Sequence, residues 1–500
     1  MALATSEVLA QRSGGVPSLV GALGGAVVDR APGWLSTLAI DRLGGGDKAF
    51  LLSTIVVVCL GLGAGVGVAA RRRRWVGPAA MAGFGAIGWL AAATTSGSSG
   101  AGALVAAALA VAVGSLALHA SLALADLGTR ASPDRTVRRA EPIGLPTRRA
   151  FLAASGAVVL ASGAAVALGR SLRVTAKAAV ARAKVVLPRA GRVAPEPAAA
   201  ASFAVPGLTP LITANDAFYR IDEAIVVPDV DPDGWKLQVG GMVRDPFTLT
   251  YAELLAEPMI EAHVTLACVS NRVGEDLIGT ARWLGVPLKA LLDRAGVDPS
   301  ASQVVGRSVD GFTVGFPTSV AVDGRDAMVA VGMNGEPLPV LHGFPARLVV
   351  PGLYGYVSAT KWLNEIELST LDAFDAYWIR RGWDQIAPVL TQSRIDVPHN
   401  RQTVAAGDVV IAGVAWAQHR GVSKVEVRVD DGPWTPAELA AALSTDTWRQ
   451  WRFPWVAVRG DHTIAVRATD ASGTVQEERP VPPGPNGATG NHTVRVGVSA

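Results

Sequence analysis

Cysteine and aromatic residues are scarce in this chain of 500 residues. It has two cysteines, Cys59 and Cys268, and aromatic residues make up 6% of the sequence although half of all residues are apolar. Two cysteines so far apart, one of them inside an apolar run, exclude the disulfide framework of a small secreted protein. The sequence also has no CxxCH haem-attachment motif and no cysteine cluster for an iron–sulfur centre. The sequence therefore contains no motif for a covalently attached haem or for an iron–sulfur centre.

The apolar residues are concentrated in the first third of the chain. Residues 50–70 read FLLSTIVVVCLGLGAGVGVAA, about long enough to cross a bilayer core of roughly 30 Å. Weaker apolar stretches occupy residues 76–93 and 101–125, and a fourth begins at Phe151. We expect a transmembrane region of about four helices at residues 50–170. Residues 1–49 are interrupted by proline and charged residues, and their placement stays open.

Arginine placement orients these helices. Short cytoplasmic loops retain Lys and Arg, which puts Arg71–Arg74 and the basic segment at residues 130–149 inside. The fourth helix then carries everything after residue 170 out of the cytoplasm, so we expect a multi-pass cell-membrane protein with its C-terminal two thirds extracytoplasmic. Arg148 and Arg149 directly precede the fourth apolar run and resemble a twin-arginine export signal, with positive-inside anchors as the less favoured alternative.

The region after the helices divides by its residue patterns. Residues 171–204 are rich in alanine and proline and are expected to be a linker. Residues 205–400 mix short β-rich runs with helix-like segments such as YAELLAEP and VPLKALLDRAG, which is typical of one α+β domain. Residues 401–500 show short alternating strands separated by Gly, Asp and Pro turns, which predicts an immunoglobulin-like β-sandwich.

Four motifs follow one another in a fixed order: ITANDAFYRID, TLACVSNRVG, TARWLGVPLKALLDRAGV and MNGEPLPVLHGFPARLVVPGLYGYVSATKWL. Together they resemble the molybdenum-cofactor domain of the sulfite oxidase family, and the sandwich after them is similar to that family's dimerisation domain. The resemblance covers residues 205–500. It implies a molybdopterin-dependent oxidoreductase with Mo-molybdopterin as its cofactor, and a homodimer formed through the C-terminal domain.

The same resemblance gives Cys268 a role. It implies that Cys268 is the thiolate ligand of the molybdenum. A soft thiolate suits a metal with sulfur co-ligands, and metal binding deprotonates the thiol and protects it from oxidation. Composition alone would favour a different interpretation, in which Cys268 is a small buried hydrophobe.

Further residues are assigned to the cofactor by the resemblance. It implies that the pterin and its phosphate are held by Asn215, Phe218, Tyr219, His342, Arg347, Ser358, Thr360 and Lys361. Arginine offers a planar fork and lysine a point charge, which together suit a phosphate. Taken singly, Arg347 could pair with a carboxylate and Lys361 could be a solvated charge. Ser308 and Asp310 fall where the family also has cofactor contacts, with an ordinary turn as the equal alternative.

The substrate side departs from the animal and plant sulfite oxidases. Val273 follows Arg272 where that family has paired arginines, and Trp383 stands at the approximate position of the active-site tyrosine. The C-terminal tail PGPNGATGNHTV also lacks the arginine that those enzymes contribute from the sandwich. Because several cationic donors are missing, the sulfite dianion is disfavoured as the substrate.

Some candidate substrate contacts remain. Arg220 is retained, and Arg380 or Arg381 could add positive charge. Trp283 is expected beside the metal pocket, with a plain core tryptophan as the alternative. Cys268, Arg220 and Trp283 are therefore the candidate catalytic residues.

These observations predict a membrane-anchored, extracytoplasmic molybdenum-cofactor oxidoreductase. We expect oxygen-atom transfer to or from a small sulfite-like or sulfoxide-like substrate. The predicted membrane helices contain one histidine, His119, too few for bis-histidine haem, so electrons require an external cytochrome or membrane electron carrier. No nucleic-acid partner is expected. The alternative function is a redox-inactive, membrane-tethered binding or assembly protein that keeps the fold.

Overall fold

The computed structural model describes residue 5 and residues 19–31, 47–93, 100–130, 178–224 and 227–499. Its contacts divide the chain into two compact units. One consists of residues 1–177 with 224–228, and the other of residues 178–223 with 229–500. The apolar helices lie in the first unit, whereas the second contains both the α+β domain and the sandwich.

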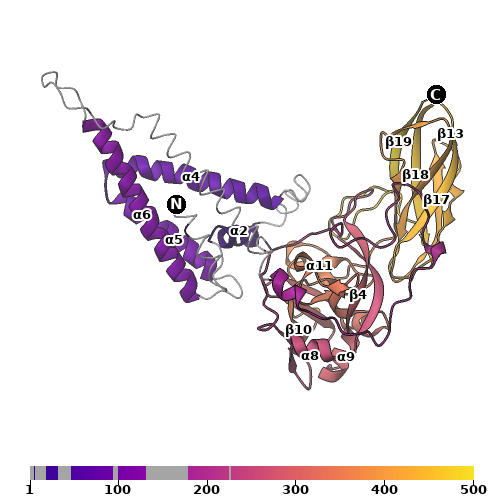
Figure 1. The fold of residues 1–500 in the computed structure, drawn as a ribbon, viewed down its shortest axis with the longest axis horizontal. Helices are drawn as coiled ribbons and strands as arrows, with labels where there is room; N and C mark the ends of the chain where they lie inside the picture. The colour runs from indigo at the N-terminus through magenta and orange to yellow at the C-terminus, as the bar shows by residue number, and fades with distance from the viewer. Residues whose placement is uncertain are drawn as a thin grey trace. The chain divides into compact units, whose positions relative to one another are not determined.

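The described part of the first unit is helical (Figure 1). Its helices are α2 Leu19–Arg30, α4 Asp47–Arg72, α5 Val76–Ala93 and α6 Gly100–Arg130. Three apolar stretches are long enough to cross a membrane, as predicted: Ser53–Arg72, Val76–Ala93 and Gly100–Ala120. Helix α2 has 12 residues and is too short to span a bilayer. The fourth predicted span and the twin-arginine pair lie outside the described residues.

Helices α5 and α6 pack closely through small residues. Gly77 lies against Leu118 and Gly85 against Val111, and a Cβ on either glycine would overlap the neighbouring side chain. Lipid tails are as apolar as leucine, so helices in a bilayer associate through close packing of this kind rather than through the hydrophobic effect. The pair is therefore packed like two helices of a membrane protein.

Residues 178–204 are the described part of the segment expected to be a linker. This segment lies along the α+β domain, where Gly191 N donates to Met259 O at 2.8 Å. It then reaches the sandwich, where Phe203 N donates to Gln450 Oε1 at 2.8 Å. The segment is therefore hydrogen-bonded both to the α+β domain and to the sandwich.

The α+β domain is built from two sheets, with strand orders β2-β1-β10-β5-β6 and β3-β4-β7-β8, and β9 pairs with β7. The strands are β1 Lys236–Gly241, β2 Phe247–Thr250, β3 Ile260–Ala267, β4 Ile278–Pro287, β5 Gln303–Ser308, β6 Thr313–Pro317, β7 Met328–Met333, β8 Glu336–Pro337, β9 Arg347–Val349 and β10 Leu363–Ser369. The helices are α8 Tyr251–Ala256, α9 Leu288–Ala295, α10 Thr318–Val322 and α11 Gly355–Ser358, with 3-10 turns η3 Val340–His342 and η4 Ile379–Arg381. Strand β7 is buried at every position, so the second sheet lies in the core.

Local sequence signals account for the two helices singled out from the sequence. Thr250 and Glu253 form a capping box at the start of α8, in which Glu253 N donates to Thr250 Oγ1 at 3.3 Å. Along α9 the buried leucines Leu288, Leu291 and Leu292 recur at helical spacing. Both helices therefore cover the sheets with one apolar face.

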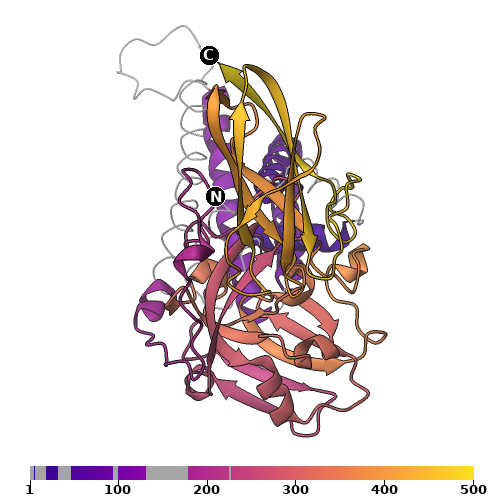
Figure 2. The ribbon, with the colours of Figure 1, turned by 90° about the vertical axis from the view of Figure 1, so that its right-hand side faces the viewer.

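The C-terminal region is the predicted immunoglobulin-like sandwich (Figures 1 and 2). Its sheets have the orders β11-β13-β17-β16 and β12-β19-β18-β14-β15. The strands are β11 Gln392–Val397, β12 Thr403–Ala405, β13 Gly407–Trp416, β14 Val422–Val429, β15 Thr435–Pro436, β16 Glu438–Leu439, β17 Arg449–Ala457, β18 Gly460–Asp470 and β19 His492–Ser499. The space between the sheets is filled by apolar side chains that include Ile411, Trp451 and Val496, as the alternation of the strands predicts.

The α+β domain and the sandwich share part of one hydrophobic core. Trp416 and Trp448 come from the sandwich but are buried among side chains of the α+β domain. Trp448 is 1% exposed, and its indole Nε1 donates to Leu211 O at 2.8 Å. The two domains are therefore joined by buried apolar surface as well as by the chain.

We predict that Trp448→Ala destabilises both domains together. The free energy of unfolding of the full chain should fall by about 3–5 kcal/mol, since a buried tryptophan leaves a large cavity. Denaturant unfolding followed by far-UV circular dichroism and by tryptophan fluorescence should give coincident transitions. Trp434→Ala is the matched control, because Trp434 is only half-buried between the guanidinium groups of Arg428 and Arg467. Separate transitions for the two domains would contradict the shared core.

Candidate functional site

Cys268 directly follows β3, in the loop of residues 268–277 that leads to β4. The two ends of this loop are tied together because Cys268 N donates to Leu277 O at 2.9 Å. Within it, Leu277 N donates to Asn271 Oδ1 at 2.8 Å. Burial raises the pKa of the Cys268 thiol, and hydrogen bonds from Ser270 act in the opposite direction. Cys268 is therefore a partly buried, protonated thiol on a hydrogen-bonded loop.

Residues of the first motif lie near this loop and contact the fourth motif. The Phe218 ring stacks on Tyr219, with 5.2 Å between ring centroids, and meets His342 edge-on at 5.6 Å. Asn215 Oδ1 accepts a hydrogen bond from Asn334 Nδ2 at 2.9 Å. The structure thus brings together Asn215, Phe218, Tyr219 and His342, four of the predicted pterin contacts.

Tyr219 links this aromatic group to the thiol. Burial raises the pKa of Tyr219 and the nearby Cys268 raises it further, whereas Arg347 acts in the opposite direction. The phenol therefore keeps its proton at neutral pH and can act as a hydrogen-bond donor. Three separate motifs contribute these three side chains to one place.

His342 is held as a neutral imidazole. Its Nε2 lies 2.9 Å from Asn215 O, and because a carbonyl oxygen only accepts, the ring proton sits on Nε2. Burial, with a smaller contribution from the charge of Arg347, lowers the pKa of His342 to about 4. The Nδ1 atom is then an unprotonated acceptor at neutral pH.

Arg347 is a buried cation on β9. Its side chain is 5% exposed, the guanidinium lies 5.0 Å from the Trp283 ring centroid, and Nη1 donates to His342 O at 3.2 Å. Burial lowers the pKa of Arg347 to about 10. In the described part of the chain no carboxylate forms an ion pair with it, so the alternative of a carboxylate partner is not the arrangement found.

The VSATKW segment places its polar groups in three different ways. Ser358 Oγ donates to Tyr354 O at 2.9 Å within α11. Thr360 Oγ1 is buried and has no hydrogen-bond partner among the described residues. Lys361 Nζ forms an ion pair with the carboxylate of Asp222. Lys361 is therefore not the solvated surface charge that the sequence left open.

Ser308 and Asp310 lie in the turn between β5 and β6. Ser308 N donates to Phe312 O at 2.9 Å, and Asp310 Oδ1 accepts from Phe312 N at 3.1 Å. Val309 N donates to Trp362 O at 3.0 Å, so the turn borders the lysine segment. The ordinary-turn interpretation therefore accounts for the hydrogen bonds that Ser308 and Asp310 make.

Trp283 and Trp383, the two tryptophans considered in the sequence analysis, both pack against other side chains in the structure. Trp283 is completely buried, and its Nε1 donates to Val264 O at 3.2 Å. Trp383 packs against Tyr356 and Trp378, with ring centroids 5.5 and 5.7 Å away. Trp283 thus supports Arg347 and Phe218 from behind, which agrees with the core alternative for this residue.

The cationic side chains named as substrate contacts are engaged by other groups. Arg220 Nε lies 2.5 Å from Asp222 Oδ2. The Arg381 guanidinium lies 3.6 Å from the Tyr377 ring centroid. Arg272 helps to line a cavity of about 10 Å³ between the two domains, which is the size of a single water molecule. Arg220 and Arg381 are therefore each held by a neighbouring side chain.

Two site residues were missed from the sequence. Asn334 has a φ of 52° and bridges the motifs, because its Nδ2 donates to Asn215 Oδ1 and its Oδ1 accepts from Arg282 N at 2.9 Å. The Asn-Gly pair in MNGEPL is a turn signal that could have indicated it. Tyr354 is buried, and burial followed by the nearby Cys268 raises the pKa of Tyr354 to about 12. No sequence signal distinguishes Tyr354 from a core tyrosine.

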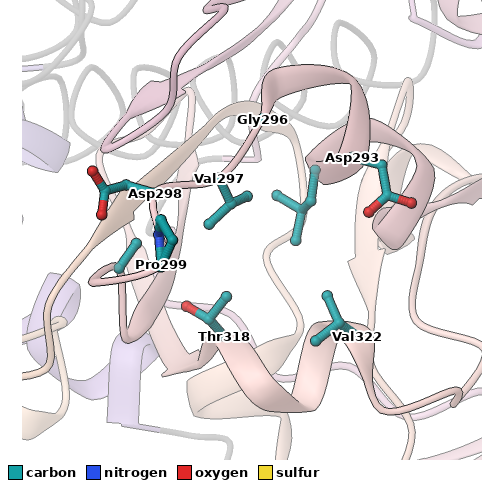
Figure 3. Close-up of a pocket in the computed structure, with 9 residues that line it drawn as sticks. Asp293, Gly296, Val297, Asp298, Pro299, Thr318 and Val322 are labelled. Carbon is teal, nitrogen blue, oxygen red and sulfur yellow. The ribbon is translucent and has the colours of Figure 1, made fainter.

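A surface hollow of about 370 Å³ lies between the end of α9, the turn after it and α10 (Figure 3). Val297, Thr318 and Val322 point into it, and Asp293 and Asp298 lie at its edges (Figure 3). None of the predicted cofactor residues lines this hollow. It is therefore separate from the residues that surround Cys268.

The residues around Cys268 fit a molybdopterin. The described residues contain no group of three or more His, Cys, Asp or Glu side chains that could hold a metal ion, so a metal at Cys268 needs further ligands from a cofactor. The buried guanidinium of Arg347 suits an anionic group, and the unpartnered hydroxyl of Thr360 offers a further hydrogen-bonding group. Tyr219 and neutral His342 supply a donor and an acceptor for a polar ring system.

Comparisons with known proteins agree with this site. The family model for the oxidoreductase molybdopterin binding domain matches residues 224–378, and the model for a bacterial Ig domain matches residues 392–496. The chain thus contains a molybdopterin-binding oxidoreductase domain followed by an immunoglobulin-like domain. In sequence, the chain is similar to sulfite oxidases. The predicted fold class and cofactor are confirmed.

Individual relatives cover part of the chain. Mitochondrial sulfite oxidase of Rattus norvegicus is 31% identical over 320 residues, which span 54% of this chain and 58% of the rat protein. NADH nitrate reductase 2 of Nicotiana tabacum is 35% identical over 179 residues, or 30% of this chain and 20% of that protein. The crystal structure of the sulfane dehydrogenase SoxCD from Paracoccus pantotrophus covers 58% of this chain and 82% of that chain with a TM-score of 0.52 and 24% identity, which supports the fold alone. The chain spans less than two thirds of the rat protein's length.

We predict that the cofactor-free chain loses stability between about pH 6.5 and pH 4, partly through His342. The folded-state pKa of His342 is about 4 against an ordinary value of 6.5, so the unfolded chain binds the proton more tightly and acid favours unfolding. His342→Gln keeps a donor for Asn215 O and should reduce this acid-induced loss by roughly 2 kcal/mol. Denaturant unfolding at several pH values measures it.

His462 provides a control of opposite sign. Its hydrogen bond to Asp430 raises the pKa of His462, so His462 contributes stability at low pH that is lost as the pH rises through its folded-state pKa. His462→Gln should therefore increase the loss of stability in acid. The assignment of His342 would be wrong if His342→Gln and the parent lost the same free energy between these pH values.

Proposed function

We propose that this protein is a membrane-anchored, extracytoplasmic molybdenum-cofactor oxidoreductase that transfers an oxygen atom to or from a small substrate. Cys268 is the protein ligand of the metal. Asn215, Phe218, Tyr219, His342, Arg347 and Thr360 hold the cofactor, and Lys361, Ser358, Ser308 and Asp310 border it. The bound cofactor supplies two-electron oxygen-atom transfer.

The observation that carries this proposal is the buried guanidinium of Arg347, which has no carboxylate partner among the described residues and, like Cys268, lies near the phenol of Tyr219. An unpaired buried charge costs several kcal/mol, which is difficult to explain in a domain whose only role is structural. An anionic group bound there removes that cost. The face of Trp283 and the carbonyl of His342 already hold the guanidinium in one orientation.

The charge around Cys268 supports a substrate other than the sulfite dianion. The carboxylate of Glu223 is close enough to Cys268 to raise the pKa of its thiol, and Asp222, with a side chain that is 2% exposed, engages both Arg220 and Lys361. The protein thus neutralises cations that a dianion would need. A neutral sulfoxide or N-oxide fits this balance better.

Membrane attachment and an external electron carrier complete the proposal. Three of the described helices are long and apolar enough to cross a bilayer, and arginine placement favours an orientation with the α+β domain outside the cytoplasm. Oxygen-atom transfer moves two electrons, and the sequence has no haem-attachment motif or cysteine cluster to receive them. A cytochrome or a membrane electron carrier therefore exchanges electrons with the site.

We predict that the purified chain, produced with the cofactor pathway present, contains about one molybdenum and one pterin per chain. Cys268→Ser should abolish turnover with artificial electron carriers, because a hydroxyl is a much poorer ligand for a soft site. Cys59→Ser in α4 is the matched control and should retain activity. Arg347→Met should reduce cofactor content by about tenfold or more at limiting cofactor, since a charge-assisted hydrogen bond contributes about 1.5–3 kcal/mol.

Two outcomes would contradict the proposed function. One is a folded chain that contains neither molybdenum nor pterin, and this would favour the redox-inactive binding protein instead. The other is full turnover by Cys268→Ser. Elemental analysis, pterin fluorescence after oxidation and steady-state assays make both outcomes visible.

We also predict that a neutral sulfoxide or N-oxide has a kcat/KM at least about tenfold above that of sulfite, because each missing charged donor costs about 1.5–3 kcal/mol. Val273→Arg, which adds a cation in the loop of Cys268, should raise kcat/KM for sulfite and leave the neutral substrate almost unchanged. A parent chain that prefers sulfite, or a variant that changes both substrates equally, would show that charge does not select the substrate.

A further inference from the structure

The sandwich contacts the chain on the N-terminal side of Cys268 through β3, mainly at Thr265. Thr265 N donates to Asp446 O at 2.9 Å, and Thr265 O accepts from Gln418 Nε2 at 3.2 Å. The hydroxyl of Thr265 accepts from Trp448 N at 2.8 Å. Strand β3 is at the edge of its sheet, so these backbone groups need partners from outside the sheet. The sandwich supplies all three hydrogen bonds.

On the C-terminal side of Cys268 the contact is made by Arg394 of β11. Its Nη1 donates to Glu275 O in the loop of residues 268–277 at 2.9 Å. Nη2 donates to Thr209 Oγ1 at 2.8 Å, and Nε to Asp396 Oδ1 at 2.7 Å. All three donor nitrogens of the guanidinium are thus engaged, and one of them fixes the backbone of the cysteine loop.

A second sandwich residue, His492, contacts the same loop. The His492 ring occupies the space next to Gly274, where a Cβ would lie 2.5 Å from the ring. Gly274 has a φ of 84°, a conformation that favours glycine. His492 Nδ1 accepts from Ile395 N at 2.9 Å, which holds the ring against the loop.

Stability alone does not explain the buried pair of Arg394 and Asp396. Both residues are 7% exposed, and removing two charges from water costs about as much as their attraction returns. What the pair does achieve is orientation, because Asp396 fixes the guanidinium whose other nitrogens reach Glu275 and Thr209. The hydrogen bonds within the cysteine loop fix its own shape, whereas the contact with Arg394 ties it to β11.

We propose that the immunoglobulin-like sandwich fixes the position of Cys268 through its contacts with the chain on both sides of this residue, in β3 and in the loop of residues 268–277. Arg394 and His492 are the positioning residues. The proposal rests on the proposed function only for the role of Cys268 as a metal ligand. The positional statement concerns the chain itself and holds with or without the cofactor.

The test measures how often the loop opens in the full-length, cofactor-free chain. In a Cys59→Ala background Cys268 is the single thiol, and its alkylation rate reports exposure of the loop. The paired substitution Arg394→Met with Asp396→Leu removes both charges, so that neither is left buried alone. We expect alkylation to become roughly tenfold faster or more.

Arg420→Met is the matched control. Arg420 is also a guanidinium of the sandwich that bonds an aspartate, Asp470, and a backbone carbonyl outside the sandwich, Val389 O, at 2.9 and 2.8 Å. It has no hydrogen bond to residues 268–277 among those the structure describes. Alkylation in this variant should change less than about twofold. His492→Ala is a second test and should accelerate alkylation in the same direction as the pair, by a smaller factor.

Two further readouts separate positioning from general loosening. Hydrogen exchange should increase in a peptide covering residues 268–277 and stay unchanged in one covering β5 and β6. In the metal-loaded chain, the sulfur-to-metal charge-transfer absorption should shift in the paired variant at equal metal content and remain unchanged in Arg420→Met.

The proposal is overturned if the folded paired variant and His492→Ala both alkylate at the parent rate. It is also overturned if Arg420→Met accelerates alkylation as much as they do, or if exchange rises equally in β5 and β6. A parent chain that takes up no molybdenum would instead overturn the proposed function, and the alkylation test would stand unaffected.

Discussion

The buried positive charge of Arg347 is the constraint on which the candidate site depends. A guanidinium removed from water without a carboxylate must find its compensation in carbonyl oxygens, aromatic faces and a bound anion. The carbonyl of His342 and the face of Trp283 supply the first two. The same charge favours the neutral form of His342 and opposes the raised pKa of Tyr219. The protonation states of the pocket therefore follow largely from burial and from this one residue.

Which residues meet was predicted from the resemblance of the ordered motifs to the sulfite oxidase family, because no motif by itself indicates its neighbours in the fold. Asn215, Phe218, Tyr219, Cys268 and Arg347 lie in three different motifs, and the structure brings them together as expected. The fold class was equally accessible, since the alternation of the C-terminal strands and the helix signals at α8 and α9 are local properties of the sequence. Membrane-length helices were found for the same reason, because length and hydropathy are local.

Individual contacts between side chains were not predictable, because they depend on how segments far apart in sequence pack together in the fold. The ion pair of Lys361 with Asp222 joins residues far apart in sequence, and either charge alone would be interpreted as solvated. The packing of residues 178–204 against the domain edges was missed because an Ala- and Pro-rich composition gives no periodic signal. Tyr354 near the thiol was missed because a buried tyrosine is ordinary in any core.

The sandwich places two tryptophans in the core of the α+β domain, and this limits how the two domains can be exchanged during evolution. The family models end at residue 378 and resume at residue 392, which looks like a point where modules could be exchanged. Trp416 and Trp448 lie beyond that point, yet they complete the core before it. A recombination event there would separate a surface from the side chains that fill it, leaving a cavity on one side and exposed apolar rings on the other. The two domains can therefore be exchanged between relatives only as a pair, and substitutions at this boundary are expected to accumulate jointly rather than independently.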